Sequence, residues 1–148
     1  MTPSDALVTD VPEFRCVLKK TLDFASQGQR IVTLGIRPTR PETGYGYIAA
    51  SAKLPNSEIC SVESFREKPT LHVAKQYISS GNYYWNSGIF IWNISTIVNS
   101  IRKFAPDLAE KMDKMSESFY TSSEVDVVND IFPTCEKIFI DYAIMEKG

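Results

Sequence analysis

The sequence predicts an α/β fold, and three observations support this prediction. A helical pattern begins at Asp10, which has capping-box spacing to Glu13, and ends near Gly28. A largely apolar run, 30–36, follows directly and is typical of a buried strand in a parallel or mixed sheet. Extended and helical patterns then continue to alternate along the chain, and a helix followed by a buried strand is the signature of this fold class.

The remaining elements follow from the same periodicities. We expect strands over 45–52, 59–66 and 83–92, the last one interrupted at its Asn-Ser-Gly tripeptide. Thr70 can cap a short helix that ends at Gly81. From residue 95 onward the pattern is helical, and the expected helices cover 95–104, 106–115, 125–132 and 141–147.

Composition restricts the class of protein. The 148 residues suffice for one domain, over 1–148, and their 43% hydrophobic and 23% charged content is typical of a soluble globular protein. A net charge of −2 argues against a general nucleic-acid binder, because no excess of lysine and arginine is present to neutralise phosphates. Neither a membrane-spanning run nor a signal-peptide pattern is found, so we expect a cytoplasmic protein without a membrane partner.

Several chemistries are excluded or disfavoured by missing motifs. The sequence contains no P-loop, no dinucleotide-binding G-x-G-x-x-G turn and no G-x-S-x-G element. The single histidine, His72, falls within a predicted amphipathic helix, where a surface or packing role is much more common than catalysis. The three cysteines are widely spaced and form no C-x-x-C pair, so we expect free buried thiols and no zinc site.

The segment 37–48, R-P-T-R-P-E-T-G-Y-G-Y-I, is the first candidate binding element. Gly44 and Gly46 flank Tyr45, so the backbone can approach a bound molecule closely there. Tyrosine offers a flat apolar face and a hydroxyl tip, which suit a sugar or a base. A stiff loop leading into an edge strand explains the same residues, and local chemistry alone does not choose between these two interpretations.

Two further polar groups lie in apolar surroundings. Glu67 and Lys68 directly follow a predicted strand; the carboxylate can accept two sugar hydroxyls, and the ammonium can contact a phosphate. Asn86 and Gly88 lie inside a predicted strand, where an amide and a bare backbone suit a hydroxyl-rich ligand. The alternatives are a solvated strand end for the first pair and a β-bulge with a self-satisfied asparagine for the second.

Asp5 is a candidate metal ligand. A carboxylate on a loop at a strand end of an α/β sheet is well placed to hold Mg²⁺ beside substrate phosphates. The alternative is an acidic residue in a frayed terminus, because no strand precedes the opening loop in this sequence.

Together, these motifs closely resemble the bacterial mannose-1-phosphate guanylyltransferases, or GDP-mannose pyrophosphorylases. The segments P-T-R-P-E-T-G-Y-G-Y-I, V-E-S-F-R-E-K-P, W-N-S-G-I-F and I-D-Y-A-I-M-E-K occur in the family's order. The resemblance implies the nucleotide-diphospho-sugar transferase fold, a Rossmann-like α/β/α sandwich around a mixed sheet. It also implies that GTP and α-D-mannose 1-phosphate are joined to give GDP-mannose and pyrophosphate, with Mg²⁺ as cofactor.

The resemblance also assigns roles to individual residues. Gly46 would present its backbone to the mannose beside Tyr45, and Glu67 would bind the sugar hydroxyls. Lys68, as a catalytic residue, would contact the sugar's phosphate. The family resemblance also places Asn86 and Gly88 in the lining of the same pocket. Asp5, the second catalytic candidate, would match a metal-binding aspartate, although Ala6 stands where the family usually has histidine.

Two family features are missing from the sequence. The Gly-rich loop that cradles the triphosphate does not precede this chain's first motif, and the strand carrying a second metal-binding aspartate does not follow its last one. The resemblance therefore implies the sugar-phosphate-binding part of the domain, incomplete at both ends and inactive alone. Uncovered sheet edges further predict self-association as a homo-oligomer. The alternatives are another sugar-1-phosphate nucleotidylyltransferase or an inactive sugar-phosphate-binding short form.

Overall fold

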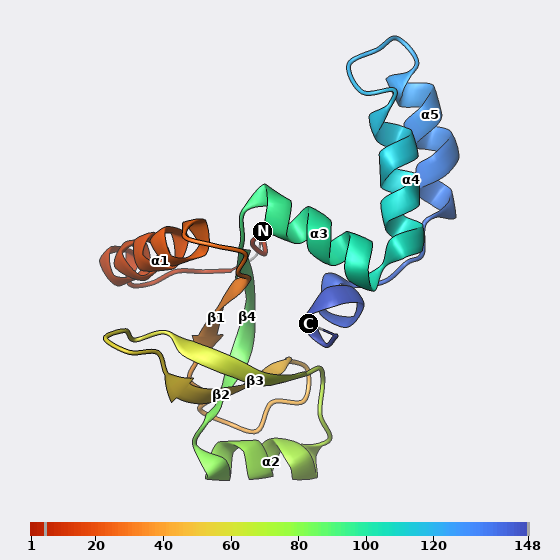
Figure 1. Cartoon of the computed structure of the whole chain (residues 1–148). Coiled ribbons are helices and arrows are strands. Elements are labelled where there is room, and N and C mark those ends of the chain that lie inside the picture. Colours follow the sequence, from red (N-terminus) through yellow and green to blue (C-terminus); the bar gives the residue numbers. More distant parts are fainter. Residues whose placement is uncertain (5, 148) are drawn as a thin grey trace. The chain divides into compact units, whose positions relative to one another are not determined.

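The computed structural model describes residues 1–4 and 6–147 (Figure 1). It divides the chain into two compact units, Met1–Asn93 and a second unit that begins at Ile94. This division reflects local packing, and the assignment of 1–148 to one partial domain stays a prediction. The first unit contains helices and strands in the order α1 (Val11–Ser26), β1 (Val32–Ile36), β2 (Tyr47–Lys53), β3 (Cys60–Arg66), α2 (Leu71–Ser80) and β4 (Tyr83–Ile91).

The four strands form one sheet in the order β1-β4-β2-β3, and every pairing among the described strands is antiparallel. Trp85 in β4 pairs with Ile36 on one side and with Tyr47 on the other. Along β4, β1 therefore covers the later half and β2 the earlier half. We expected β1 to be buried within a parallel or mixed sheet; it is instead an edge strand, and only Val32 among its residues is buried.

The strand β4 contains a bulge at its Asn-Ser-Gly tripeptide. Thr33 pairs with Phe90 and Gly35 with Asn86, so two steps along β1 correspond to four along β4. Gly88 has φ 71°, a conformation that favours glycine. The predicted interruption is therefore a bulge within one continuous strand.

Helix α1 begins as predicted. The Asp10 side chain accepts a hydrogen bond of 3.0 Å from the Glu13 N–H, which satisfies one of the free donors of the first turn. Ala25 near the helix end is buried against Val32 and the β4 residues Ile89 and Ile91. In Figure 1, α1 lies beside the end of β1 and β4 that is farther from α2. The helix thus covers the later half of β4.

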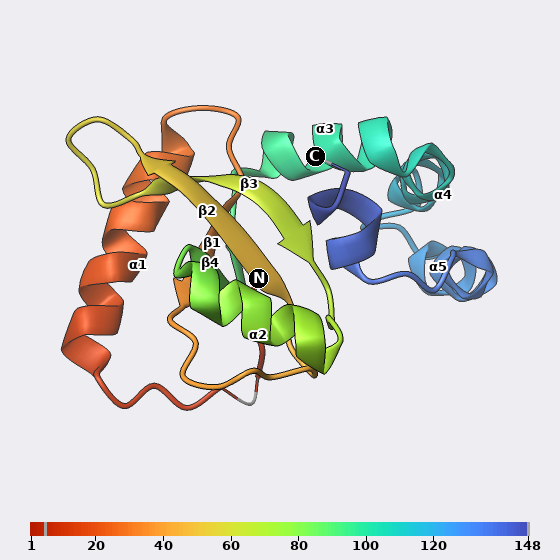
Figure 2. The same cartoon turned by 90° about the horizontal axis from the view of Figure 1, so that it is seen from below.

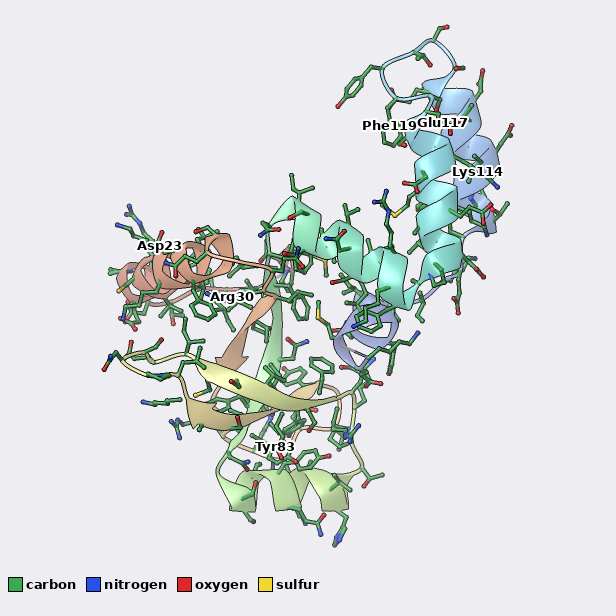
Figure 3. All side chains as sticks on the ribbon, in the orientation of Figure 1. Asp23, Arg30, Tyr83, Lys114, Glu117 and Phe119 are labelled. Carbon is green, nitrogen blue, oxygen red and sulfur yellow. The ribbon has the colours of Figure 1, made fainter. Side chains whose placement is uncertain are left out.

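Helix α2 covers the earlier half of β4. Thr70 accepts a hydrogen bond of 3.5 Å from the Val73 N–H, and Gly81 ends the helix with φ 76°, as predicted. Ala74 packs in a cluster with Tyr47 and Trp85. Partly buried tyrosines complete this cluster, and Figure 3 shows Tyr83 pointing toward α2. This aromatic cluster consists of Tyr47, Ala74, Tyr77, Tyr83 and Trp85.

The N-terminus is held by β4. The Met1 amino group donates to Phe90 O over 2.9 Å, and the Phe90 N–H donates to Met1 O over 3.0 Å. We predicted an opening loop that no strand precedes, and the described residues before α1 are a loop, but their first residue is bonded to β4. The free hydrogen-bonding groups beside the β4 bulge supply the anchor, and sequence pattern alone does not reveal such a long-range pairing.

The second unit is helical, as predicted. Helix α3 (Ile94–Phe104) packs against α4 (Pro106–Ser116), and an ion pair of 3.1 Å joins Arg102 to Asp113. Figure 2 shows α5 (Glu124–Ile131) running beside α4, as does Figure 1. A 3₁₀ turn follows, and the last element, η2, is a single π turn, Asp141–Met145, in place of the expected longer helix.

Three sequence expectations have simple structural outcomes. The three cysteines are free; Cys16 is exposed and the other two are half-buried, so the expectation of buried thiols is wrong. His72 lies exposed on α2 with its ring 3.3 Å from the Gln76 amide, which agrees with a surface role. Among the described residues, no helix is both long and apolar enough to cross a membrane.

Candidate functional site

Three predicted site residues meet at one end of the β2–β3 hairpin. Gly46 directly precedes β2 and Glu67 directly follows β3, and the neighbouring pair Tyr47–Arg66 sets these two residues side by side. The Asn86 N–H donates to Gly46 O over 2.8 Å. A side chain added at Gly46 would press against Glu67 Oε2 and would lie 3.4 Å from Asn86 Cβ. The backbone of Gly46, the carboxylate of Glu67 and the side chain of Asn86 therefore line one small space.

The close approach depends on the absence of a Gly46 side chain. Besides Glu67 and Asn86, an added Cβ would lie 3.2 Å from Phe65 Cζ, and Phe65 is only 6% exposed. The Gly46 φ is not positive, so glycine is needed here for space and not for an unusual backbone conformation.

The charged side chains of Glu67 and Lys68 differ in their exposure to solvent. The Glu67 side chain is 15% exposed, whereas that of Lys68 is 59% exposed, and Lys68 Nζ lies 3.9 Å from Glu67 Oε1. Lys68 has φ 44°, which is uncommon for a residue other than glycine. This conformation places consecutive acidic and basic side chains at one strand end, where a ligand with hydroxyls and a phosphate can engage both.

Asn86 is held inside the chain. Its Oδ1 accepts from Thr33 Oγ1 over 3.2 Å and from the Gly88 N–H over 3.1 Å. The alternative of a bulge with an internally bonded asparagine therefore describes this oxygen correctly. These bonds fix the amide's orientation, so Asn86 forms a rigid wall beside Gly46. Thr33 is a supporting residue that the sequence reasoning missed, because the register of β1 on β4 could not be read from local pattern.

Gly88 and Tyr45 lie outside the group formed by Gly46, Glu67 and Asn86. A Cβ on Gly88 would lie 3.0 Å from Pro3 Cγ, so this glycine makes room for the N-terminal segment. Tyr45 stands edge-on to Trp85, with ring centroids 5.3 Å apart. Successive residues of a strand point to opposite faces, so Trp85 and Asn86 do not share a face of β4.

A carboxylate organises the loop that carries Gly46. Glu42 Oε1 accepts from the Thr43 N–H over 3.0 Å and from the Gly44 N–H over 3.1 Å, and Arg40 contacts Oε2. These bonds lower the pKa of Glu42, mainly through the Gly44 N–H. We did not predict a role for Glu42, because capture of neighbouring backbone N–H groups is typical of the shorter Asp, Asn, Ser and Thr side chains.

The predicted magnesium site lies at a position that the structure does not describe. Asp5 falls outside residues 1–4 and 6–147, and those residues contain no group of three His, Cys, Asp or Glu side chains that could hold a metal ion. The described residues therefore offer no three-residue ligand group for Mg²⁺, and Asp5 as a ligand stays a prediction.

Comparison with known proteins identifies the family. A family model described as Nucleotidyl transferase matches residues 1–129. The chain belongs to the nucleotidyl transferase family. The similarity to proteins named mannose-1-phosphate guanylyltransferase, inferred above from four motifs, is confirmed by the curated relatives of this nucleotidyl transferase.

Two curated relatives illustrate this similarity. The xanthan biosynthesis protein XanB of Xanthomonas campestris pv. campestris (strain B100) is 40% identical over 146 residues, which are 98% of this chain and 30% of that protein. A mannose-1-phosphate guanylyltransferase of Escherichia coli is 35% identical over 98% of this chain and 32% of its own length. The chain thus spans about a third of the length of the curated relatives it matches.

Two solved structures share the fold of this nucleotidyl transferase. A Thermus thermophilus protein, described as a mannose-1-phosphate geranyltransferase, has a TM-score of 0.84 and 35% identity over 99% of this chain and 40% of its own. A Helicobacter pylori mannose-6-phosphate isomerase has a TM-score of 0.78 and 30% identity over 99% of this chain and 57% of its own. The predicted α/β nucleotidyltransferase fold class is confirmed by the family match and these similarities.

Proposed function

We propose that this chain provides the sugar-phosphate-binding part of an enzyme that makes GDP-mannose and pyrophosphate from GTP and α-D-mannose 1-phosphate. The observation that carries this proposal is the convergence of Gly46, Glu67 and Asn86 on one small space. A bare backbone, a carboxylate and a fixed amide form a surface suited to a ring bearing several hydroxyls. The adjacent exposed ammonium of Lys68 adds a contact for the phosphate.

In the proposed reaction, the residues of this chain hold the nucleophile. An oxygen of the sugar phosphate forms a bond to the α-phosphorus of GTP, the bond to the β-phosphate breaks, and pyrophosphate leaves. Glu67 binds sugar hydroxyls, and Gly46 allows the ring to approach the backbone. Lys68 balances the charge of the sugar's phosphate and fixes its direction of attack. Such positioning and charge neutralisation are the main contributions a protein makes to phosphoryl-type transfer.

Other parts of the proposal rest on the resemblance alone. These parts are the binding of Mg²⁺ in part by Asp5, the choice of GTP as the nucleotide, assembly into a homo-oligomer and a cytoplasmic location. The curated relatives named mannose-1-phosphate guanylyltransferase support the sugar phosphate and nucleotide as substrates. None of the described residues is assigned to the triphosphate, so we expect these 148 residues to bind the sugar phosphate without making GDP-mannose by themselves.

Titration calorimetry of the chain with α-D-mannose 1-phosphate and, separately, with GTP tests the proposal. We expect binding of the sugar phosphate, and loss of about 2–3 kcal/mol of that binding in Glu67→Gln, because one charged hydrogen-bond acceptor becomes neutral. Glu58→Gln is the matched control, since Glu58 is an exposed carboxylate paired with Lys20 at the far end of the hairpin.

The same titrations separate the alternatives. Equal affinity for glucose 1-phosphate would favour a different sugar-1-phosphate nucleotidylyltransferase. Sugar-phosphate binding by a natural protein that carries this chain but never forms GDP-mannose would favour the inactive binding form. An unchanged affinity in Glu67→Gln would remove Glu67 from the site and refute the proposed arrangement.

A further inference from the structure

Glu42 forms hydrogen bonds near both ends of the short segment 43–46. At the start of this segment, the Glu42 carboxylate accepts the N–H bonds of Thr43 and Gly44. Just past its end, the Tyr47 hydroxyl donates to the Glu42 backbone oxygen over 2.9 Å. Tyr47 is fully buried, so this second contact links the loop to the core. One residue thus fixes the approach to Gly46 from both directions.

The Glu42 carboxylate is itself held in place. Arg40 donates to the single oxygen Oε2 through two nitrogens, Nη2 at 3.2 Å and Nε at 3.3 Å, which leaves Oε1 for the Thr43 and Gly44 N–H groups. The Arg40 guanidinium also lies over the ring of Trp85, 5.5 Å from its centroid, and Trp85 is only 8% exposed. A chain of contacts therefore runs from the buried β4 indole through Arg40 to Glu42.

Gly46 depends on such neighbours for its position. It has no side chain of its own to lock it into the core, and its carbonyl must meet the Asn86 N–H. The residue before it, Tyr45, packs edge-on against the same Trp85 ring that Arg40 covers. The side chains of Tyr45 and Arg40 thus both pack on the Trp85 indole and align the loop with β4. Glu42 bonds Arg40 on one side and the backbone of Thr43 and Gly44 on the other.

We propose that Glu42, braced by Arg40, is a positioning residue that sets the backbone of Gly46 against Asn86 and so determines how closely a sugar ring approaches. The role in sugar binding rests on the function proposed above, whereas the positioning of the backbone does not. Glu42 makes no contact with the ligand in this scheme. Its effect passes entirely through the loop.

The structure separates this role from simple stabilisation of a surface loop. In Glu42→Gln, the remaining amide oxygen can still accept the Thr43 and Gly44 N–H bonds, and only the charged pair with Arg40 is lost. In Glu42→Ala, all these contacts are lost. A positioning role predicts that the glutamine variant restores most of the geometry that the alanine variant loses. Glu58→Ala provides the control, because it removes an exposed, lysine-paired carboxylate far along the hairpin.

The test uses the ¹⁵N-labelled chain in these four forms. Nuclear magnetic resonance reports the amide signals of Gly46 and Asn86, and titration with α-D-mannose 1-phosphate reports affinity. In Glu42→Ala we expect both amide signals to shift and the affinity for α-D-mannose 1-phosphate to fall about tenfold. In Glu42→Gln we expect both signals to stay near their wild-type positions and the affinity to stay within about threefold of the wild-type value. Glu58→Ala should match the wild type in both measurements.

The two readouts separate failure of this inference from failure of the proposed function. Unmoved Gly46 and Asn86 signals in Glu42→Ala overturn the inference, whatever ligand binds. The inference is also overturned if the signals move while the wild-type affinity is retained. Absence of binding by the wild type defeats the proposed function, and the amide signals still decide whether Glu42 positions Gly46. If Glu42→Ala does not fold, Glu42→Met removes the acceptor oxygens while keeping a side chain of similar length, and unmoved Gly46 and Asn86 signals in that variant refute the inference.

Discussion

Replacement of Gly46 by alanine tests the packing on which the site depends. The added methyl group would press against Glu67 Oε2, 3.2 Å from Phe65 Cζ and 3.4 Å from Asn86 Cβ. Only the Glu67 side chain can move aside, because Phe65 is buried and Asn86 is fixed by Thr33 and Gly88. We therefore expect an overpacking cost of about 1–3 kcal/mol.

Two assays measure this change. At about 2–4 °C per kcal/mol for a chain of this size, the thermal midpoint followed by circular dichroism should fall by roughly 2–12 °C. Displacement of Glu67 should also weaken binding of α-D-mannose 1-phosphate by about tenfold or more. Gly28→Ala is the matched control, because its added Cβ would meet only the Arg30 side chain, at 3.7 Å. A Gly46→Ala protein with wild-type midpoint and affinity would refute the close approach described here.

Three further predictions concern single residues. Lys68→Gly should raise the free energy of unfolding in urea by about 1 kcal/mol, because glycine adopts the positive φ without strain. The same change should weaken sugar-phosphate binding, and a loss of stability would contradict the strain argument. Asp10→Ala should lower stability by about 1 kcal/mol through loss of the α1 cap, with Asp23→Ala on the same helix as control; equal midpoints for the two would argue against the cap. The lowered pKa of Glu42 means that its carboxylate favours the folded state above the ordinary value of 4.5, and that this contribution disappears as pH falls through the lower folded-state pKa. The Thr43 and Gly44 amide signals should titrate at that lower pH, and titration at the ordinary value would show that the bonds to Glu42 are not formed.

Local signals predicted the elements of this chain well. The caps at Asp10 and Thr70 and the stop at Gly81 act within one helical turn, so their effects can be read from a few neighbouring residues. The bulge in β4 was likewise signalled by an asparagine and a glycine inside an aromatic strand. These features depend on short-range sterics and hydrogen bonds, which the sequence displays directly.

The pairing of the strands could not be predicted from local sequence patterns. An apolar run such as β1 looks alike in a buried parallel strand and in an edge strand beside an amphipathic helix, because both bury one or more apolar side chains. The tie between Met1 and Phe90 joins residues 89 positions apart. The site was predicted in part because its residues belong to recognisable motifs, whereas the supports from Thr33 and Glu42 depend on register and loop geometry.

The sharing of Trp85 between β1 and β2 has a consequence for errors in strand alignment. A slip of β2 by one residue along β4 would turn Tyr47 out of the aromatic cluster and carry Gly46 past Asn86, while the pairing of β1 would stay intact. The tyrosines of the aromatic cluster and Ala74 of α2 therefore favour one register, since they accept only one alignment of β2, which Gly46 directly precedes. A substitution at the buried Ala74 of α2 can thus weaken sugar-phosphate binding through the register of β2, although Ala74 is not among the residues that line the candidate site.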